Sequence, residues 1–287
     1  MTRDPSAPGP SAAVRDVTLG SLIFRVTDTG PPRGRPVLLL HGFPQTSWCW
    51  RHVVPALATA GHRVLTLDQR GYSPGACPEA VEDYAGEHLV SDVTGILDVL
   101  GIESVDLVGH DWGAAVAWQV AGYHPERVTT LTAISVPHPG AFMEALASDP
   151  DQQARSAYLA DFATPGYERA LLADDAAGLR SLFGDETAVD VDHVLSRLGT
   201  ETQLRPALNW YAAQSARRAL ATPHSSVPTL HIWSDADPAL GAYGARTTHR
   251  YVTGPYRLVT LRDVGHWIPE AAPQQTADLV SAHLTQH

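Results

Sequence analysis

The stretch that decides the fold is Val108-Gly109-His110-Asp111-Trp112-Gly113-Ala114, written VGHDWGA. It follows the mainly apolar run 105–107 and precedes residues of helical period. Two glycines frame the aspartate at the spacing of a sharp strand-to-helix turn, which exposes its central side chain at the edge of a sheet. This spacing favours Asp111 as a nucleophile. The alternative is an aspartate that caps the following helix.

Apolar strands and amphipathic helices alternate on both sides of this turn. Strands are predicted at residues 14–19, 22–27, 36–40, 62–67, 105–108, 128–135, 229–233 and 256–261. Helices are predicted at residues 48–60, 87–100, 112–123 and 271–284. Such alternation indicates an α/β fold, with a mostly parallel sheet and helices on both faces.

The pattern changes in residues 138–227, which consist of helical segments separated by turn clusters and contain no convincing strand. Because this stretch is too long for a connecting loop, we interpret it as an inserted helical cap. The core domain is then expected to comprise residues 14–137 and 228–287. Residues 1–13 are rich in Pro, Ser and Ala and are interpreted as a disordered lead-in without a signal peptide.

Composition excludes several classes of function. The net charge is -11 and no basic cluster is visible, so neither nucleic acid nor an anionic membrane is expected as a partner. All 20 basic residues are arginine, which excludes Schiff-base chemistry and the lysine of a phosphate-binding loop. Cys49 and Cys77 suit a reducing cytoplasm and have no metal-ligand spacing. We expect no metal and no cofactor.

A second motif, Gly71-Tyr72-Ser73-Pro74-Gly75, has the spacing of a serine nucleophile turn. That turn needs the backbone N–H of the residue after the nucleophile, and Pro74 has none. The following residues also do not begin a helix cleanly. We therefore expect Ser73 to have a role in a loop only.

Two later segments supply a base and an acid. His266 follows the predicted strand 256–261, and Asp237 and Asp235 follow the strand 229–233. The chain order of nucleophile, acid and histidine is the one expected when all three follow parallel strands. We predict His266 as the base and favour Asp237 over Asp235 as its partner, because Asp237 lies further into the loop.

The segment His41-Gly42-Phe43-Pro44 follows the apolar strand 36–40. A loop in this position supplies the second N–H of an oxyanion hole, whose first N–H belongs to Trp112. Phe43 is therefore expected to donate its backbone N–H and to line the pocket with its ring. His41 itself is expected to be structural.

Together these residues resemble the α/β-hydrolase superfamily, within it the branch of soluble epoxide hydrolases and haloalkane dehalogenases that use an aspartate nucleophile. The resemblance covers nearly everything from residue 14 onward. Leu208-Asn209-Trp210-Tyr211 looks like the cap motif of the epoxide hydrolases, and the segment that begins at Tyr158 is similar to their other tyrosine region. The resemblance implies an α/β-hydrolase fold.

The resemblance also implies a chemistry for these positions. Asp111 would open an epoxide to give an alkyl-enzyme ester, with Tyr158 and Tyr211 donating to the departing oxygen. His266, oriented by Asp237, would activate the water that hydrolyses the ester, releasing a vicinal diol. The expected partners are a small apolar epoxide and water, while the oligomeric state stays open.

Several alternatives remain at this point. A haloalkane dehalogenase, a lactone or ester hydrolase, and a non-catalytic binding protein or biosynthetic tailoring enzyme could share the scaffold. Fluoroacetate dehalogenases have arginine where this chain has Trp112, which weighs against them. Aromatic residues are predicted to line the substrate pocket, although core packing explains each equally well; they are Phe43, Trp48, Trp112, Phe162 and Trp267.

Overall fold

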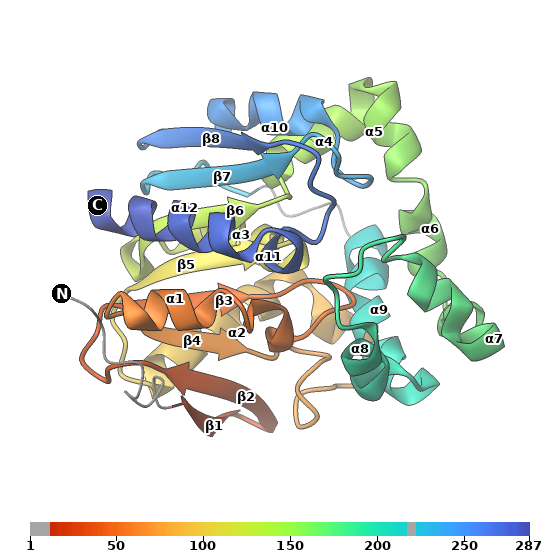
Figure 1. Cartoon of the computed structure of the whole chain (residues 1–287). Helices are drawn as coiled ribbons and strands as arrows, with labels where there is room; N and C mark the ends of the chain where they lie inside the picture. The colour runs from red at the N-terminus through yellow and green to blue at the C-terminus, as the bar shows by residue number, and fades with distance from the viewer. Residues whose placement is uncertain (1–11, 217–221) are drawn as a thin grey trace.

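The computed structural model describes residues 12–216 and 222–287, which form an eight-stranded sheet with helices on both faces (Figure 1). The strands lie in the spatial order β1-β2-β4-β3-β5-β6-β7-β8. Their bounds are β1 Ala12–Leu19, β2 Leu22–Thr29, β3 Pro36–Leu40, β4 Arg63–Leu67, β5 Val105–His110, β6 Val128–Ile134, β7 Thr229–Ser234 and β8 Tyr256–Leu261.

The sheet is parallel from β4 through β8, and the hairpin of β1 and β2 joins it antiparallel at one edge. The central strands are apolar and buried on both faces, as parallel strands covered by helices require. Edge strand β1 is largely exposed by contrast. The sequence-based prediction of an α/β fold with a mostly parallel sheet is confirmed.

Two pairs of helices cover the two faces of the sheet. Figure 1 shows α1 (Val54–Thr59) and α12 (Pro273–Gln286) in front, and α2 (Gly86–Val99) and α3 (Trp112–Tyr123) behind. Each pair closes its own buried apolar cluster against the strands. Because α3 is covered by α2 and by the sheet, its sequence is apolar on nearly every side.

Between β6 and β7, every element in the described part of the chain is a helix. Figure 1 shows most of these helices beyond the arrowheads of the parallel strands, so they lie over the carboxyl edge of the sheet. Their bounds are α4 Pro139–Ser148, α5 Pro150–Arg155, α6 Tyr158–Phe162, α7 Glu168–Ser181, α8 Val191–Leu198 and α9 Glu201–Ala216.

Some boundaries differ from the predicted ones. The predicted helix 48–60 is a short 3-10 turn at Ser47–Trp50 followed by α1, whose Pro55 occupies the first turn, where its missing N–H costs nothing. Before α12 the chain forms α11 (Ile268–Ala271), and α10 (Ala242–Thr247) was not predicted. Residues 1–11 of the predicted lead-in lie outside the described residues. None of the described helices is long and apolar enough to cross a membrane.

Candidate active site

Asp111 lies at the turn between β5 and α3 with an unusual backbone, φ 53° and ψ -124°. The turn is this tight because of its glycines. A Cβ at Gly113 would overlap the carbonyl oxygen of Leu40, and a Cβ at Gly109 would overlap that of Gly113. The carboxylate makes none of the hydrogen bonds to the second or third residue of α3 that define a helix cap, so it does not act as the alternative helix cap.

Two backbone N–H groups hold one side of the Asp111 carboxylate. Phe43 donates its N–H to Oδ1 over 2.8 Å, and the N–H of Trp112 donates to the same carboxyl group. Gly42 lets the two segments approach, since a Cβ there would overlap the carboxylate. The two donors predicted for an oxyanion hole thus converge on this group.

The other side of Asp111 faces His266. Its Oδ2 lies 3.4 Å from Nε2 of His266, and Nδ1 of His266 lies 2.9 Å from Oδ2 of Asp237. Asp237 is only 1% exposed, and its Oδ1 accepts hydrogen bonds from the N–H groups of Ala239 and Leu240. Asp235 is exposed and accepts instead from the N–H of a surface loop. The structure therefore places Asp237, and not Asp235, beside the histidine.

The charges of this group stabilise one another. Burial would lower the pKa of His266, but the carboxylates of Asp237 and Asp111 outweigh it and raise that pKa to about 10. Burial would raise the pKa of both carboxyls, yet the cationic imidazole holds the pKa of each below its usual value. Near neutral pH the resting site therefore holds two carboxylates on either side of an imidazolium.

Two tyrosines from the inserted helices face this group. Tyr158 begins α6 and Tyr211 lies on α9, with ring centroids 6.4 Å apart. The side chain of Trp112 donates a hydrogen bond to the hydroxyl of Tyr211. Burial raises the pKa of both phenols well above the ordinary value, and the charge of Asp111 adds to the effect. Both hydroxyls therefore keep their protons and can donate them.

A cavity of about 170 Å³ brings these groups together. Seven of its twelve lining residues are apolar. It is lined by Phe43, Pro44, Asp111, Arg155, Tyr158, Phe162, Leu182, Tyr211, Pro238, Ala239, His266 and Trp267.

Trp48 does not line this cavity, so its predicted place in the substrate pocket is wrong. It is 44% exposed, donates its indole N–H to Asp190 and stacks on His193 at the surface, where it attaches α8 to the core. Trp112 does not line the cavity either, so its predicted place in the pocket lining is also wrong; its ring packs behind the lining residue Tyr211, with ring centroids 5.1 Å apart.

Two other predictions concerned residues outside the site. Ser73 is fully buried, donates to the carbonyl of Asp68 and accepts from the N–H of Arg25, as expected of a loop residue. His41 is also fully buried, and its Nε2 accepts from the N–H of Gln69.

Sequence reasoning missed two residues of the site. Arg155 of α5 lines the cavity and donates to the main-chain carbonyl of Asp237 over 2.6 Å. His110 contacts the main-chain carbonyl of His266 through Nε2 at 2.9 Å, and burial lowers its pKa to about 4. His110 was visible inside the VGHDWGA motif. Arg155 had no local signal, because only tertiary packing brings α5 to the acid loop.

Comparison with known proteins gives consistent results. Residues 35–273 match the model of the alpha/beta hydrolase fold family. The chain is 33% identical to "Epoxide hydrolase A" of Mycobacterium tuberculosis, over 94% of this chain and 97% of that protein. It is 30% identical to mouse "Epoxide hydrolase 4", over 96% and 83%. A crystal structure of epoxide hydrolase A from Mycobacterium thermoresistibile superposes with a TM-score of 0.83 at 29% identity, covering 96% of this chain and 98% of that one.

Proposed function

The chain belongs to the α/β-hydrolase family, and from that premise we propose that it is an epoxide hydrolase that works through a covalent ester on Asp111. One observation carries the proposal. A single cavity is lined by a carboxylate that accepts backbone N–H groups, a histidine paired with Asp237, and two tyrosines. The names of its relatives support the same substrate class.

In the first step, Oδ2 of Asp111 attacks an epoxide carbon while the ring C–O bond breaks. The carboxylate is ionised at neutral pH, so it needs no base to attack. Oδ1 keeps its hydrogen bond from the N–H of Phe43 and becomes the ester carbonyl oxygen. The departing oxygen takes a proton from Tyr158 or Tyr211, where charge develops in the transition state.

Formation of the ester changes His266. The ester removes the charge of Asp111, which is one of the two carboxylates that raise the pKa of the imidazole. The pKa of His266 therefore falls, and its proton returns to the ionised tyrosine. The neutral imidazole is then available as a base only after the covalent step.

In the second step, His266 takes a proton from water, and the resulting hydroxide attacks the ester carbonyl carbon. The N–H groups of Phe43 and Trp112 stabilise the oxyanion, and each such donor contributes roughly 3 to 4 kcal/mol in related chemistry. The intermediate collapses by breaking the bond between the carbonyl carbon and the diol oxygen, and this oxygen takes the proton that remained on the water-derived hydroxyl. The products are the diol and the Asp111 carboxylate, and His266 keeps the other proton of the water. The diol keeps an oxygen of Asp111, while the new carboxylate oxygen comes from water.

This exchange of oxygen gives the test. Excess enzyme is mixed with styrene oxide in ¹⁸O-water for a single turnover, and the diol and the peptide containing Asp111 are analysed by mass spectrometry. We expect unlabelled diol and label on Asp111. Labelled diol with unlabelled Asp111 would show direct attack of water and would exclude the ester, whereas absence of diol would exclude epoxide hydrolysis.

A further inference from the structure

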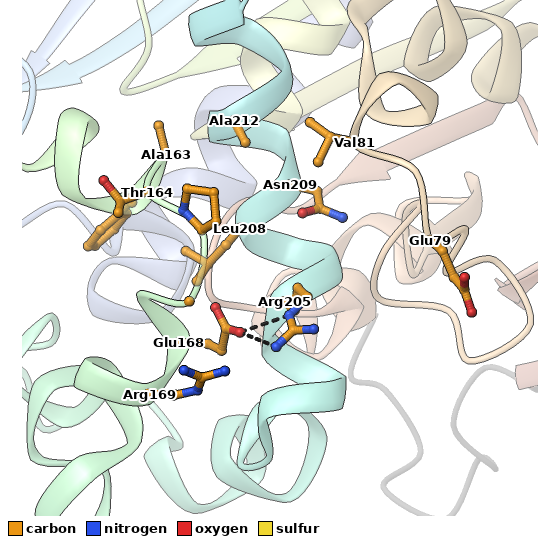
Figure 2. Close-up of a pocket in the computed structure, with 13 residues that line it drawn as sticks. Glu79, Val81, Ala163, Thr164, Glu168, Arg169, Arg205, Leu208, Asn209 and Ala212 are labelled. Atoms are coloured by element: carbon orange, nitrogen blue, oxygen red, sulfur yellow. Dashed lines mark hydrogen bonds and ion pairs between the residues drawn. The ribbon is translucent and has the colours of Figure 1, made fainter.

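A second cavity borders the reactive one. Its volume is about 380 Å³, and it lies between α9, the segment after α6 and a core segment at Val81. Figure 2 shows Leu208 and Ala212 on α9, with Thr164 on one side of the helix and Val81 on the other. Of the residues that the structure describes, only Phe162 lines both cavities.

Phe162 forms a partition between the two spaces. Its ring packs against Tyr158 and Tyr211 with centroids 5.0 and 5.1 Å away, and against Phe43 at 5.4 Å. Because Phe162 borders open space on two sides, it lacks packing atoms there, and a change of its rotamer displaces fewer neighbours than in a closed core. Phe162 is also the last residue of α6, which has only five residues.

The chemistry of the second cavity favours an uncharged occupant. Leu208, Ala212 and Val81 give it apolar walls. At its rim, Arg205 pairs with Glu168 over 2.5 Å and Arg169 pairs with Glu201 over 3.2 Å. The lining holds two arginines and two glutamates, Glu79 and Glu168, so it has no net charge. An alkyl or aryl chain therefore suits the cavity better than an anion does.

The volumes of the two cavities also favour a substrate chain as the occupant of the second one. The reactive cavity is smaller than the roughly 300 to 1,000 Å³ of typical ligand sites, whereas the two cavities together fall within that range. We propose that the second cavity holds the distal chain of a long uncharged epoxide, and that Phe162 turns aside to admit it. The inference rests on the proposed epoxide hydrolysis at Asp111.

The test compares kcat/KM for 1,2-epoxydodecane with kcat/KM for 1,2-epoxybutane, and the readout is their ratio. Phe162→Ala opens the partition, while the matched control Leu182→Ala enlarges the reactive cavity without bordering the second one. Each newly buried methylene contributes up to about fourfold in binding, so Phe162→Ala is expected to raise the ratio at least about tenfold. Leu182→Ala is expected to change it less than about threefold.

Thr164→Trp provides the opposite change, since Thr164 lines only the second cavity of the two. It is expected to lower the ratio about tenfold in the wild-type chain and to cancel the gain of Phe162→Ala. This variant keeps the proposal testable if Phe162→Ala does not fold.

The outcomes separate the two proposals. If the wild-type chain opens neither epoxide, the proposed function fails. Two other results would overturn only the second-cavity proposal, provided that the wild-type chain opens 1,2-epoxybutane. One is a ratio that Thr164→Trp leaves unchanged, and the other is a ratio that Phe162→Ala and Leu182→Ala change equally.

Discussion

The two oxygens of Asp111 have different surroundings, and this difference assigns them different tasks. Oδ1 accepts the N–H of Phe43, whereas Oδ2 faces His266 and the cavity. A serine in this position would need His266 to remove its proton before attack. An ionised aspartate leaves the histidine for water, so the two halves of the reaction can be separated by mutation.

Replacement of His266 by glutamine should trap the ester. Loss of the imidazolium removes the charge that lowers the pKa of Asp111, so the reaction is run near pH 8, where the carboxylate stays ionised. We expect the peptide containing Asp111 to gain the mass of one styrene oxide, while kcat falls at least about a thousandfold. The control His266→Gln/Asp111→Asn should gain no mass. Normal turnover by His266→Gln would contradict the scheme.

The two tyrosines should affect only the first step of the reaction, in which Asp111 is alkylated. Tyr158→Phe and Tyr211→Phe each remove one donor to the departing oxygen, and a positioned general acid contributes about 10² to 10⁴-fold. We expect each variant to slow alkylation of Asp111 in stopped-flow measurements, and the double variant to abolish it. Tyr167→Phe is the control, because Tyr167 contacts Phe162 but does not line the reactive cavity. Equal effects of all three substitutions would leave the tyrosines without a specific role.

At the scale of elements, the sequence located the site because each central group follows a strand. Asp111 follows β5, Asp237 follows β7 and His266 follows β8, so local patterns sufficed. The contribution of α5 was invisible, because the contact between Arg155 and the carbonyl of Asp237 joins residues 82 positions apart. Trp48 was misplaced for a related reason: its partners on the α8 side are also distant in sequence.

The loop after β7 carries two carboxylates and offers a matched pair of substitutions. Asp237→Asn removes the charge beside His266, and we expect kcat to fall by about 10³ to 10⁴-fold, as for other histidine partners. Asp235→Asn changes the same loop at an exposed position and should leave kcat within about twofold. Steady-state kinetics with styrene oxide measures both, and a larger loss in Asp235→Asn would reverse the assignment.

At the scale of the whole molecule, the parallel sheet brings the loops after β3, β5, β7 and β8 to one edge. The inserted helices lie over that edge (Figure 1). The alternation of strands and helices predicted this edge, because carboxyl ends of parallel strands converge. It could not predict the two cavities, whose sizes depend on how side chains of α6, α7 and α9 pack. The buried charges of the site link the chemistry to the stability of the molecule.

This linkage predicts how stability depends on pH. The folded-state pKa of His266, about 10, lies above its ordinary value of 6.5, so folding favours the protonated form. The contribution is complete below about pH 6.5 and is lost as the pH rises toward 10, by up to ~1.4 kcal/mol per pH unit. The pKa values of Asp111 and Asp237 are lowered, so their contribution is present above about pH 4 and is lost on further acidification.

Denaturant unfolding of the wild-type chain and of His266→Gln at pH 6.5, 8 and 9.5 tests this expectation. Groups outside the site titrate alike in both proteins, so the difference between their free energies of unfolding reports His266 together with the two carboxyls beside it. We expect that difference to shrink as the pH rises from 8 to 9.5, where the carboxyls are ionised in both proteins and only the wild-type chain binds an additional proton on folding. A difference that stays constant over this range would mean that the folded state does not hold the imidazolium between its two carboxylates. The base would then be neutral before the ester forms, and the order of proton transfers proposed for the site would have to be reversed.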